Sequence, residues 1–230
     1  MTAADVTLAS FSPSEGVSGW NYYTDYVATL KANGNIDKRY GYISAYWAGE
    51  YWDASAQGWY DFAFLRTDPE TITEEQVGNT KIPYGTAFLV YTAKSGVTIT
   101  FAGEVLEDDI AIALNENANT FVGNARPTAV KLGEISATDG ISGWNYYTDF
   151  LATLKTNGNI DNRYGYISAY WAGEYWNASA QGWYDFAFLR TDPETITEDQ
   201  VGDAVEFNPG DGFLVYVGKP NIELLVPSAL

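Results

Sequence analysis

The stretch YGYISAYWAGEYWDASAQGWYDFAFL, residues 40–65, returns almost unchanged as residues 164–189. The one difference within it replaces Asp53 with Asn177. Extended outward, the matching block runs over residues 18–78 and again over residues 142–202, with six differences in 61 positions. All eight Trp of the 230-residue chain lie in these two copies. A repeat of this length predicts two units of the same fold. Two alternatives explain the near identity: recent duplication of the block, or the same function carried out by both copies.

The repeat is incomplete at one place. Outside the block, Val6–Leu8 aligns with Val130–Leu132, and Phe88–Tyr91 aligns with Phe213–Tyr216. Residues 106–124 occur only once, and they contain two strand-like pieces joined by an Asn-rich turn, residues 110–114 and 120–122. We therefore expect a first β-module over residues 1–104 that lacks this opening hairpin, and a second over residues 105–230 that includes it.

Hydrophobic patterning within each copy predicts mostly strands. Tyr22, Tyr26 and Leu30 are four residues apart, which predicts one short amphipathic helix over residues 21–31 and another over residues 145–155. Alternating apolar residues predict strands at 40–47, 59–65, 88–92 and 97–101, with a hairpin loop at 49–58 and one helical turn at 73–76. The fold class expected is all-β, with two tandem, near-identical, mainly antiparallel β-sandwich-like modules that carry one short helix each.

Composition excludes several kinds of site. The chain has no Cys and no His, so thiolate catalysis, Cys/His zinc sites and Ser-His-Asp triads are ruled out. Its formal net charge is −18, which disfavours nucleic acid and anionic membranes as partners. No apolar run approaches the ~18 residues that cross a bilayer, so membrane insertion is not expected. The N-terminus lacks the charged and apolar regions of a signal peptide, and we expect a mature secreted chain.

Four short segments resemble parts of a known module. NTFVGNARP (residues 119–127) is similar to the "GWNLVGNPYP" segment that opens a β-module of secreted bacterial surface proteins, although it lacks the Trp and the second aromatic residue. GDGFLVY (residues 210–216) resembles the "GQGFFV" strand near the end of that module, as GTAFLVY (residues 85–91) does less closely. Ile99-Thr100-Phe101 is similar to its last strand. The resemblance implies β-sheet and an extracellular or cell-surface location, and it names no activity.

The aromatic residues between the expected strands are the main candidates for contact with a ligand or partner. They lie off the alternating pattern in the expected loop, and loop aromatics are typical of interfaces, whereas alternating strand aromatics are typical of a core. Trp and Tyr can stack on sugar rings while nearby amides and carboxylates bind the hydroxyls. The candidate residues are Tyr51, Trp52, Asp53 and Gln57, with Tyr175, Trp176, Asn177 and Gln181 in the second copy.

Acidic residues offer two further kinds of site. Glu50 and Asp61, and likewise Glu174 and Asp185, could form a glycosidase pair, but carboxylates near strand ends are usually solvated and we expect no enzyme. Asx-rich segments after the predicted helices supply oxygen ligands for calcium, and an ordinary Asx turn is the competing interpretation. The calcium candidates are Asn33, Asn35, Asp37, Asn157, Asn159 and Asp161. No other cofactor is expected.

Two functions are consistent with these patterns. The first is a non-enzymatic extracellular structural protein that associates with itself head to tail into a filament, sheath or surface layer. Strand complementation at the missing hairpin would hold it together, with assembly contacts from Val6, Leu8, Ile222, Leu224 and Val226. The alternative is a bivalent carbohydrate-binding or adhesive module pair that uses the Trp and Tyr loops.

Overall fold

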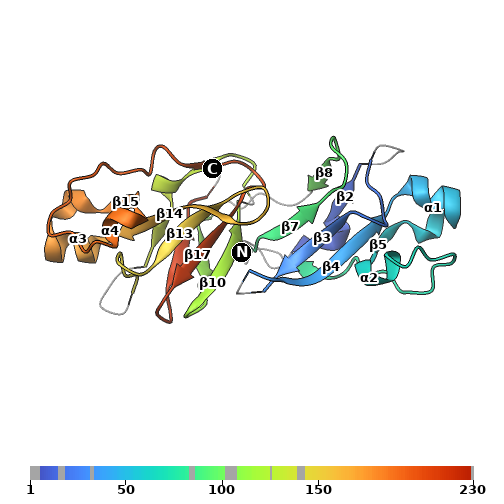
Figure 1. The fold of residues 1–230 in the computed structure, drawn as a ribbon, viewed down its shortest axis with the longest axis horizontal. Coiled ribbons are helices and arrows are strands. Elements are labelled where there is room, and N and C mark those ends of the chain that lie inside the picture. The colour runs from blue at the N-terminus through green and yellow to red at the C-terminus, as the bar shows by residue number, and fades with distance from the viewer. Residues whose placement is uncertain are drawn as a thin grey trace. The chain divides into compact units, whose positions relative to one another are not determined.

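The computed structural model describes residues 6–14, 19–31, 34–82, 86–101, 108–124, 126–138 and 143–228 (Figure 1). It is an all-β protein, built from antiparallel strands with a few short helices. The chain divides into two compact units. Unit 1 comprises Met1–Lys31 and Asn35–Glu104, and unit 2 comprises Ala32–Gly34 and Val105–Leu230.

Unit 1 contains one larger sheet and two strand pairs, all antiparallel. The sheet has the order β5 (Gly58–Asp61), β4 (Ile36–Ile43), β3 (Tyr26–Leu30) and β7 (Phe88–Tyr91). The pairs are β1 (Val6–Thr7) with β6 (Lys81–Ile82), and β2 (Phe11–Pro13) with β8 (Ile99–Phe101). Its helices are α1 (Ala45–Tyr51), α2 (Phe62–Leu65) and the 3₁₀ turns Leu8–Ser10 and Ala54–Ala56.

Unit 2 has the same connections and two additional strands. Its five-stranded sheet has the order β15 (Gly182–Asp185), β14 (Ile160–Ile167), β13 (Phe150–Leu154), β17 (Gly212–Val217) and β10 (Ala118–Gly123). A three-stranded sheet joins β12 (Ser136–Ala137), β18 (Glu223–Val226) and β9 (Ile110–Ala113), and β11 (Val130–Lys131) pairs with β16 (Glu206–Phe207). Its helices are α3 (Ala169–Tyr175), α4 (Phe186–Leu189) and the 3₁₀ turns Leu132–Glu134 and Ala178–Ala180.

The helix predicted over residues 21–31, and its copy over 145–155, are wrong. Residues 26–30 form β3, which pairs with β4 on one side and with β7 on the other. Ahead of it, the amides of Thr24 and Asp25 bond to the carbonyl of Asn21 and close a turn. Tyr22, Tyr26 and Leu30 are four residues apart because the first lies in this turn and the other two lie on β3. Pairing of β3 with a strand on each side outweighs the local helical pattern.

The aromatic block holds more helix than its alternation predicts. Strand β4 ends at Ile43, and residues 45–51 form α1 where the strand 40–47 and the loop 49–58 were expected. Strand β5 ends at Asp61, whose carboxylate accepts a bond from the Ala63 amide and caps α2. The helical turn predicted at residues 73–76 is absent from the structure. Short helices between the strands interrupt the two-residue alternation of apolar side chains that is typical of a strand.

The single-copy segment forms both expected strands, but they do not pair with each other. Strand β9 joins β18 at the edge of one sheet, and β10 joins β17 at the edge of another. The predicted hairpin over residues 106–124 is therefore wrong for residues 108–124, and residues 106 and 107 lie outside the described residues. The segment crosses from one sheet to the next, because each strand finds its partner in a later part of the chain.

Four of the Trp residues form the core. Trp20 and Trp59 in unit 1, and Trp144 and Trp183 in unit 2, are at most 1% exposed. Each pair meets edge to face, with ring centroids 5.9 Å apart in unit 1 and 5.7 Å apart in unit 2. The indole N–H of Trp183 also donates to the carbonyl of Ile135 at 2.7 Å. These Trp residues are structural, and of the other four, Trp171 and Trp176 line a surface pocket in unit 2.

Candidate functional site

Unit 2 carries a pocket of about 410 Å³ that is lined mainly by aromatic side chains. Its size is in the range of small-molecule sites. Aromatic rings supply apolar faces, and an amide and two carboxylates supply polar groups that can orient a ligand. The lining residues are Asn145, Tyr146, Tyr147, Trp171, Tyr175, Trp176, Asp192, Pro193 and Glu194.

Helix α3 presents two of the rings as a stacked pair. Trp171 and Tyr175 are one helical turn apart, and their rings lie 5.4 Å apart with an interplanar angle of 20°. The indole N–H of Trp171 donates to the carbonyl of Trp144 at 2.6 Å, which ties this ring to the core. Tyr175 is 58% exposed, so one ring of the stack is anchored while the other offers its surface to solvent.

Tyr146 forms the floor beneath these rings. Its ring meets Trp171 and Trp176 edge-on, at 5.4 Å and 5.0 Å. Its hydroxyl donates to the carboxylate of Asp192 at 2.7 Å. Burial, and then this bond to a carboxylate, raise the pKa of Tyr146 well above its ordinary value. The phenol therefore stays protonated and holds Asp192 at the pocket wall.

The turn before β13 supplies the third side of the pocket. The Asn145 side chain accepts a bond from the Tyr147 amide at 2.9 Å, and the Asn145 amide donates to the buried carboxylate of Asp149 at 2.8 Å. Asp149 also accepts a bond from the Gly218 amide at 2.9 Å. This turn is thus fastened to the end of β17, and it presents Tyr147, which is 40% exposed.

Unit 1 has the same residues at all nine positions of the pocket lining. The hydroxyl of Tyr22 donates to Asp68 at 2.7 Å, as in the copy. Trp47 stacks on Tyr51 at 5.5 Å and 18°, and Trp52 meets Tyr22 edge-on at 5.1 Å. The arrangement of contacts is therefore present twice. The unit 1 residues are Asn21, Tyr22, Tyr23, Trp47, Tyr51, Trp52, Asp68, Pro69 and Glu70.

Two of the eight predicted contact residues line this pocket, two more occupy the equivalent positions in unit 1, and the other four are outside the lining. Tyr175 and Trp176 line the pocket, and Tyr51 and Trp52 occupy the same positions in unit 1. Tyr51 is 55% exposed, whereas Trp52 and Trp176 are half-buried.

Asp53, Asn177, Gln57 and Gln181 bond within their own unit. Asp53 accepts bonds from the hydroxyl and the amide of Ser55 and caps a 3₁₀ turn, and these bonds lower its pKa. Asn177 caps the equivalent turn. Gln57 and Gln181 donate at 3.0 Å to the hydroxyls of strand tyrosines, Tyr42 and Tyr166.

Sequence reasoning missed most of the polar lining. Asn145 lies in the predicted helix over residues 145–155, and neither Asp192 nor Glu194 is among the predicted contact residues. They come together because the Tyr146 hydroxyl reaches a carboxylate 46 residues away. One usable signal was present, because the segments NYY and DPE are identical in both copies.

The carboxylates considered for catalysis do not face this pocket. Asp185 accepts a bond from the Ala187 amide at 2.7 Å and caps α4, as Asp61 caps α2. Glu50 and Glu174 are exposed on α1 and α3. None of the four is among the residues that line the pocket.

The calcium candidates lie in and after an Asx-rich turn. In unit 2 the Asn157 side chain accepts a bond from the Asn159 amide at 3.0 Å, and Asp161 is 3.8 Å from the Lys155 ammonium. In unit 1, Asp37 lies on β4, Asn35 lies just before it, and Asn33 lies outside the described residues. Across the described ranges, no three acidic side chains are grouped as metal ligands.

The residues proposed as assembly contacts are buried or half-buried within their own units. Leu8, Ile222 and Leu224 are at most 1% exposed, Val226 is 7% exposed, and Val6 is half-buried. Strand β18, which carries Leu224 and Val226, is flanked by β12 and β9 within its own unit. To act on a neighbouring molecule, these side chains would have to leave their own core.

Comparisons with known proteins do not identify a relative. No protein-family model, no curated protein sequence and no solved structure matches the chain. Among the described residues, no helix has both the length and the apolar character needed to cross a membrane.

Proposed function

We propose that this chain is a non-catalytic extracellular protein that binds glycans through one aromatic pocket in each repeat. The observation that carries the proposal is the stack of Trp171 and Tyr175 beside Asp192 and Glu194 in a pocket of about 410 Å³. Pyranose faces pack against such rings, and carboxylates and amides accept bonds from sugar hydroxyls.

The charge of the chain narrows the class of glycan. With a net charge of −18 and carboxylates in the pocket lining, an acidic sugar would be repelled. Neutral hexose polymers, or glycans that carry amino groups, meet no such barrier. Two sites in one chain also suit a repetitive glycan, because the second contact forms at a high effective concentration.

A sandwich arrangement supports this function and is part of the proposal. In unit 2 one hydrophobic cluster combines residues from the five-stranded sheet, such as Val215, with residues from the three-stranded sheet, such as Leu224. Two sheets that share one core in this way would make a rigid base. The aromatic pocket would then lie on helices and turns that this base holds in place.

The test is binding to a panel of immobilised neutral, amino and acidic glycans. The double variant Tyr51→Ala/Tyr175→Ala removes the exposed ring of both stacks, and it should abolish binding without changing the melting temperature. Tyr91→Ala is the matched control, since Tyr91 is similarly exposed at 48% but lies on β7. Glycan binding that survives in the double variant, or a wild-type chain that binds no glycan, would reject the proposal.

Self-association into a filament, sheath or surface layer is the second candidate. The observation that favours it is the exposure of apolar residues on β7, where Val90 is 40% exposed while Val215, its counterpart in unit 2, is 0% exposed. Light scattering and negative-stain microscopy over a wide concentration range would test this candidate. A chain that remains monodisperse at millimolar concentration would exclude it.

A further inference from the structure

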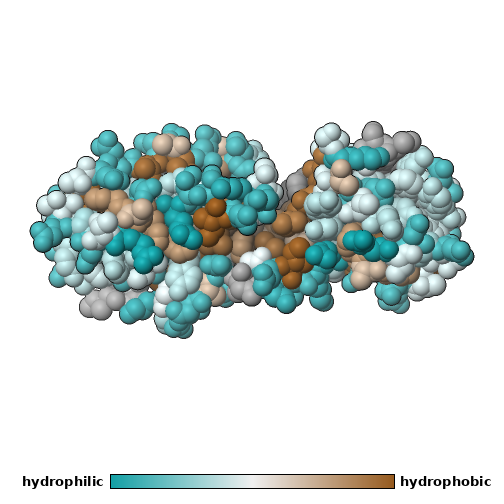
Figure 2. Space-filling view, viewed as in Figure 1, coloured by the Kyte–Doolittle hydropathy of each residue, from teal (hydrophilic) through white to brown (hydrophobic). Residues whose placement is uncertain are grey.

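Identical strand sequences have different surroundings in the two units. The sequence Phe-Leu-Val-Tyr forms β7 in unit 1 and the middle of β17 in unit 2. Val90 and Tyr91 of β7 are 40% and 48% exposed, whereas their counterparts in β17 are 0% exposed (Val215) and half-buried (Tyr216). Figure 2 shows hydrophobic surface in the part of unit 1 where Figure 1 places β7.

In unit 2, the single-copy segment lies against the edge of β17 and covers it. Strand β10 pairs with β17 over six residues, from Ala118 opposite Val217 to Gly123 opposite Gly212. Strand β9 pairs with β18 over four residues. In unit 1, β7 is the last strand of its sheet and β8 pairs with β2 alone, as far as the described residues show.

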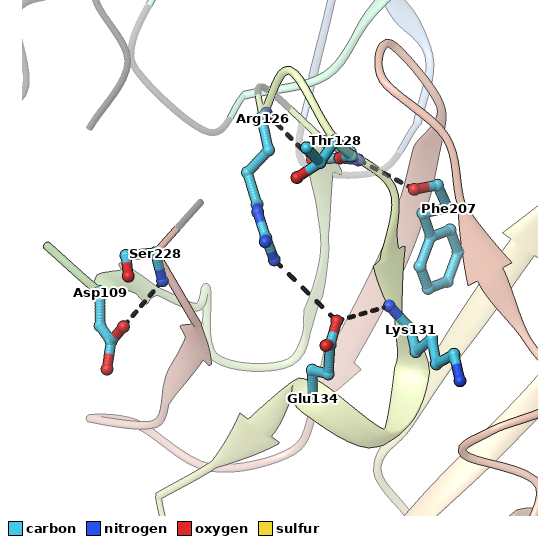
Figure 3. A network of polar contacts seen from close by, with 8 residues as sticks. Asp109, Arg126, Thr128, Lys131, Glu134, Phe207 and Ser228 are labelled. Carbon is cyan, nitrogen blue, oxygen red and sulfur yellow. Dashed lines mark hydrogen bonds and ion pairs between the residues drawn. The ribbon is translucent and has the colours of Figure 1, made fainter. Parts of the chain in front are cut away.

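Polar contacts fasten both ends of this covering segment (Figure 3). At its start, Asp109 accepts a bond from the Ser228 amide at 2.7 Å. At its end, the buried Asn124 side chain donates to the carbonyls of Thr128 and Phe207, at 3.1 Å and 2.9 Å. The cover is thus an integral part of unit 2.

We propose that the exposed edge of unit 1, formed by β7, is an acceptor for an extended polypeptide strand of the β10 type supplied by another chain. The occupant is defined by what covers β17 in the same molecule: the segment 109–124, ending in the strand Ala118–Gly123. A strand edge that has apolar side chains, no charged residue and no neighbouring strand among the described residues is a template for strand addition. This inference uses the same edge as the second candidate function but assigns it a different partner, because self-association requires a second copy of this chain.

The number of segments of the β10 type limits which polypeptide can provide the added strand. Residues 108–124 are the one segment of this type among the described residues, and unit 2 already holds it. A second copy could complete unit 1 only by opening its own unit 2, with no net gain in strand pairing. The donor is therefore a polypeptide that carries a further segment of the same type.

The test uses the full chain and a labelled synthetic peptide of residues 108–126. We expect saturable one-to-one binding by fluorescence anisotropy, and hydrogen exchange at residues 88–91 slowed by about tenfold or more. A peptide with proline at the positions of Thr120 and Val122 should not bind, because it cannot complete the ladder. Tyr175→Ala should bind the peptide as the wild type does, which separates this site from the glycan pocket.

A fused variant tests the same edge without substituting any residue of β7. Fusing residues 107–124 ahead of Met1 places a donor in the same chain, because residues 1–5 then separate it from Val6 as residues 125–129 separate it from Val130 in unit 2. This variant should melt at a higher temperature and should no longer bind the peptide. The proposal is overturned if the peptide does not bind, if it slows exchange at residues 213–217 instead, or if the fused variant still binds it. Pairing of two β7 edges in a peptide-insensitive dimer would also overturn it.

Discussion

The hydroxyl of Tyr146 donates a 2.7 Å hydrogen bond to the carboxylate of Asp192, and Tyr22 makes the same bond to Asp68 in the other repeat. Asp192 and Asp68 both have a positive φ of 53°, in the left-handed region that few residues other than Gly adopt. The bond therefore holds a turn in a sparsely populated conformation, and that turn carries the polar wall of the pocket.

Replacing Tyr146 with Phe should reduce stability and loosen the pocket together. A hydrogen bond to a charged group contributes about 1.5–3 kcal/mol, and the exposure of Asp192 lowers this to about 1–2 kcal/mol. Urea unfolding of Tyr146→Phe would measure the loss. Tyr147→Phe is the control, because Tyr147 is exposed, and its stability should stay within about 0.5 kcal/mol of the wild type. Equal stability of both variants would show that the bond does not stabilise the fold.

The protein should unfold in alkali in step with the ionisation of its buried tyrosines. Burial, followed by donation to a carboxylate, raises the pKa of Tyr22 and of Tyr146 above the ordinary value of 10.0. The folded chain then holds more protons than the unfolded chain above that pH, so stability is complete below pH 10 and falls as the pH rises further. Phenolate absorbance and circular dichroism should change together. Tyr22→Phe/Tyr146→Phe should show a shallower fall, and a fall of unchanged slope would count against this linkage.

Loss of one pocket should cost more affinity on a polymer than on a short ligand. If two sites act together, Tyr175→Ala should weaken binding to an immobilised glycan surface by about a hundredfold, because avidity is lost. The same variant should keep the wild-type affinity per remaining site for a soluble oligosaccharide in calorimetry, with half the stoichiometry. Tyr51→Ala is the matched variant in the other repeat. An equal loss in both assays would indicate that the two pockets bind independently.

Matched glycine substitutions should affect the two units differently. A Cβ at Gly202 would lie 2.7 Å from the backbone of Gly133, whereas a Cβ at Gly78 would lie 3.4 Å from the side chain of Ala9. Gly202→Ala therefore forces two backbone segments apart and should cost about 1–3 kcal/mol. Gly78→Ala should be close to neutral. Thermal unfolding of both variants is the measurement, and a larger loss for Gly78→Ala would contradict the packing seen around these residues.

Local sequence was a good guide to strands and a poor guide to their boundaries. The alternation in residues 40–43 and 59–61 predicted β4 and β5 correctly, because side chains on a strand alternate between two faces. Residues 26–30 were assigned to a helix, since the two strands that flank β3 lie elsewhere in the chain and leave no trace in its own spacing. Helix α1 was missed for a related reason, because its aromatic residues also fit an alternating pattern.

The candidate site was predictable in part. Tyr51, Trp52, Tyr175 and Trp176 were selected because they departed from the strand pattern, and two of them line the pocket described in unit 2. Tyr146 and Asp192 could not be linked from sequence, since nothing local relates residues 46 positions apart. Asp53 and Gln57 appeared to be ligand contacts, but their polar groups bond to Ser55 and Tyr42.

By itself, the sequence established the repeat, the predominance of strands and the absence of any chemistry that needs Cys or His. These follow from identity, local periodicity and composition, which do not depend on how distant segments meet. Only the tertiary structure decided which side chains form the pocket and which strand edge has no neighbour among the described residues. The same four residues, Phe-Leu-Val-Tyr, are largely buried in β17 and half exposed in β7, because burial depends on the neighbouring strand rather than on the residues themselves.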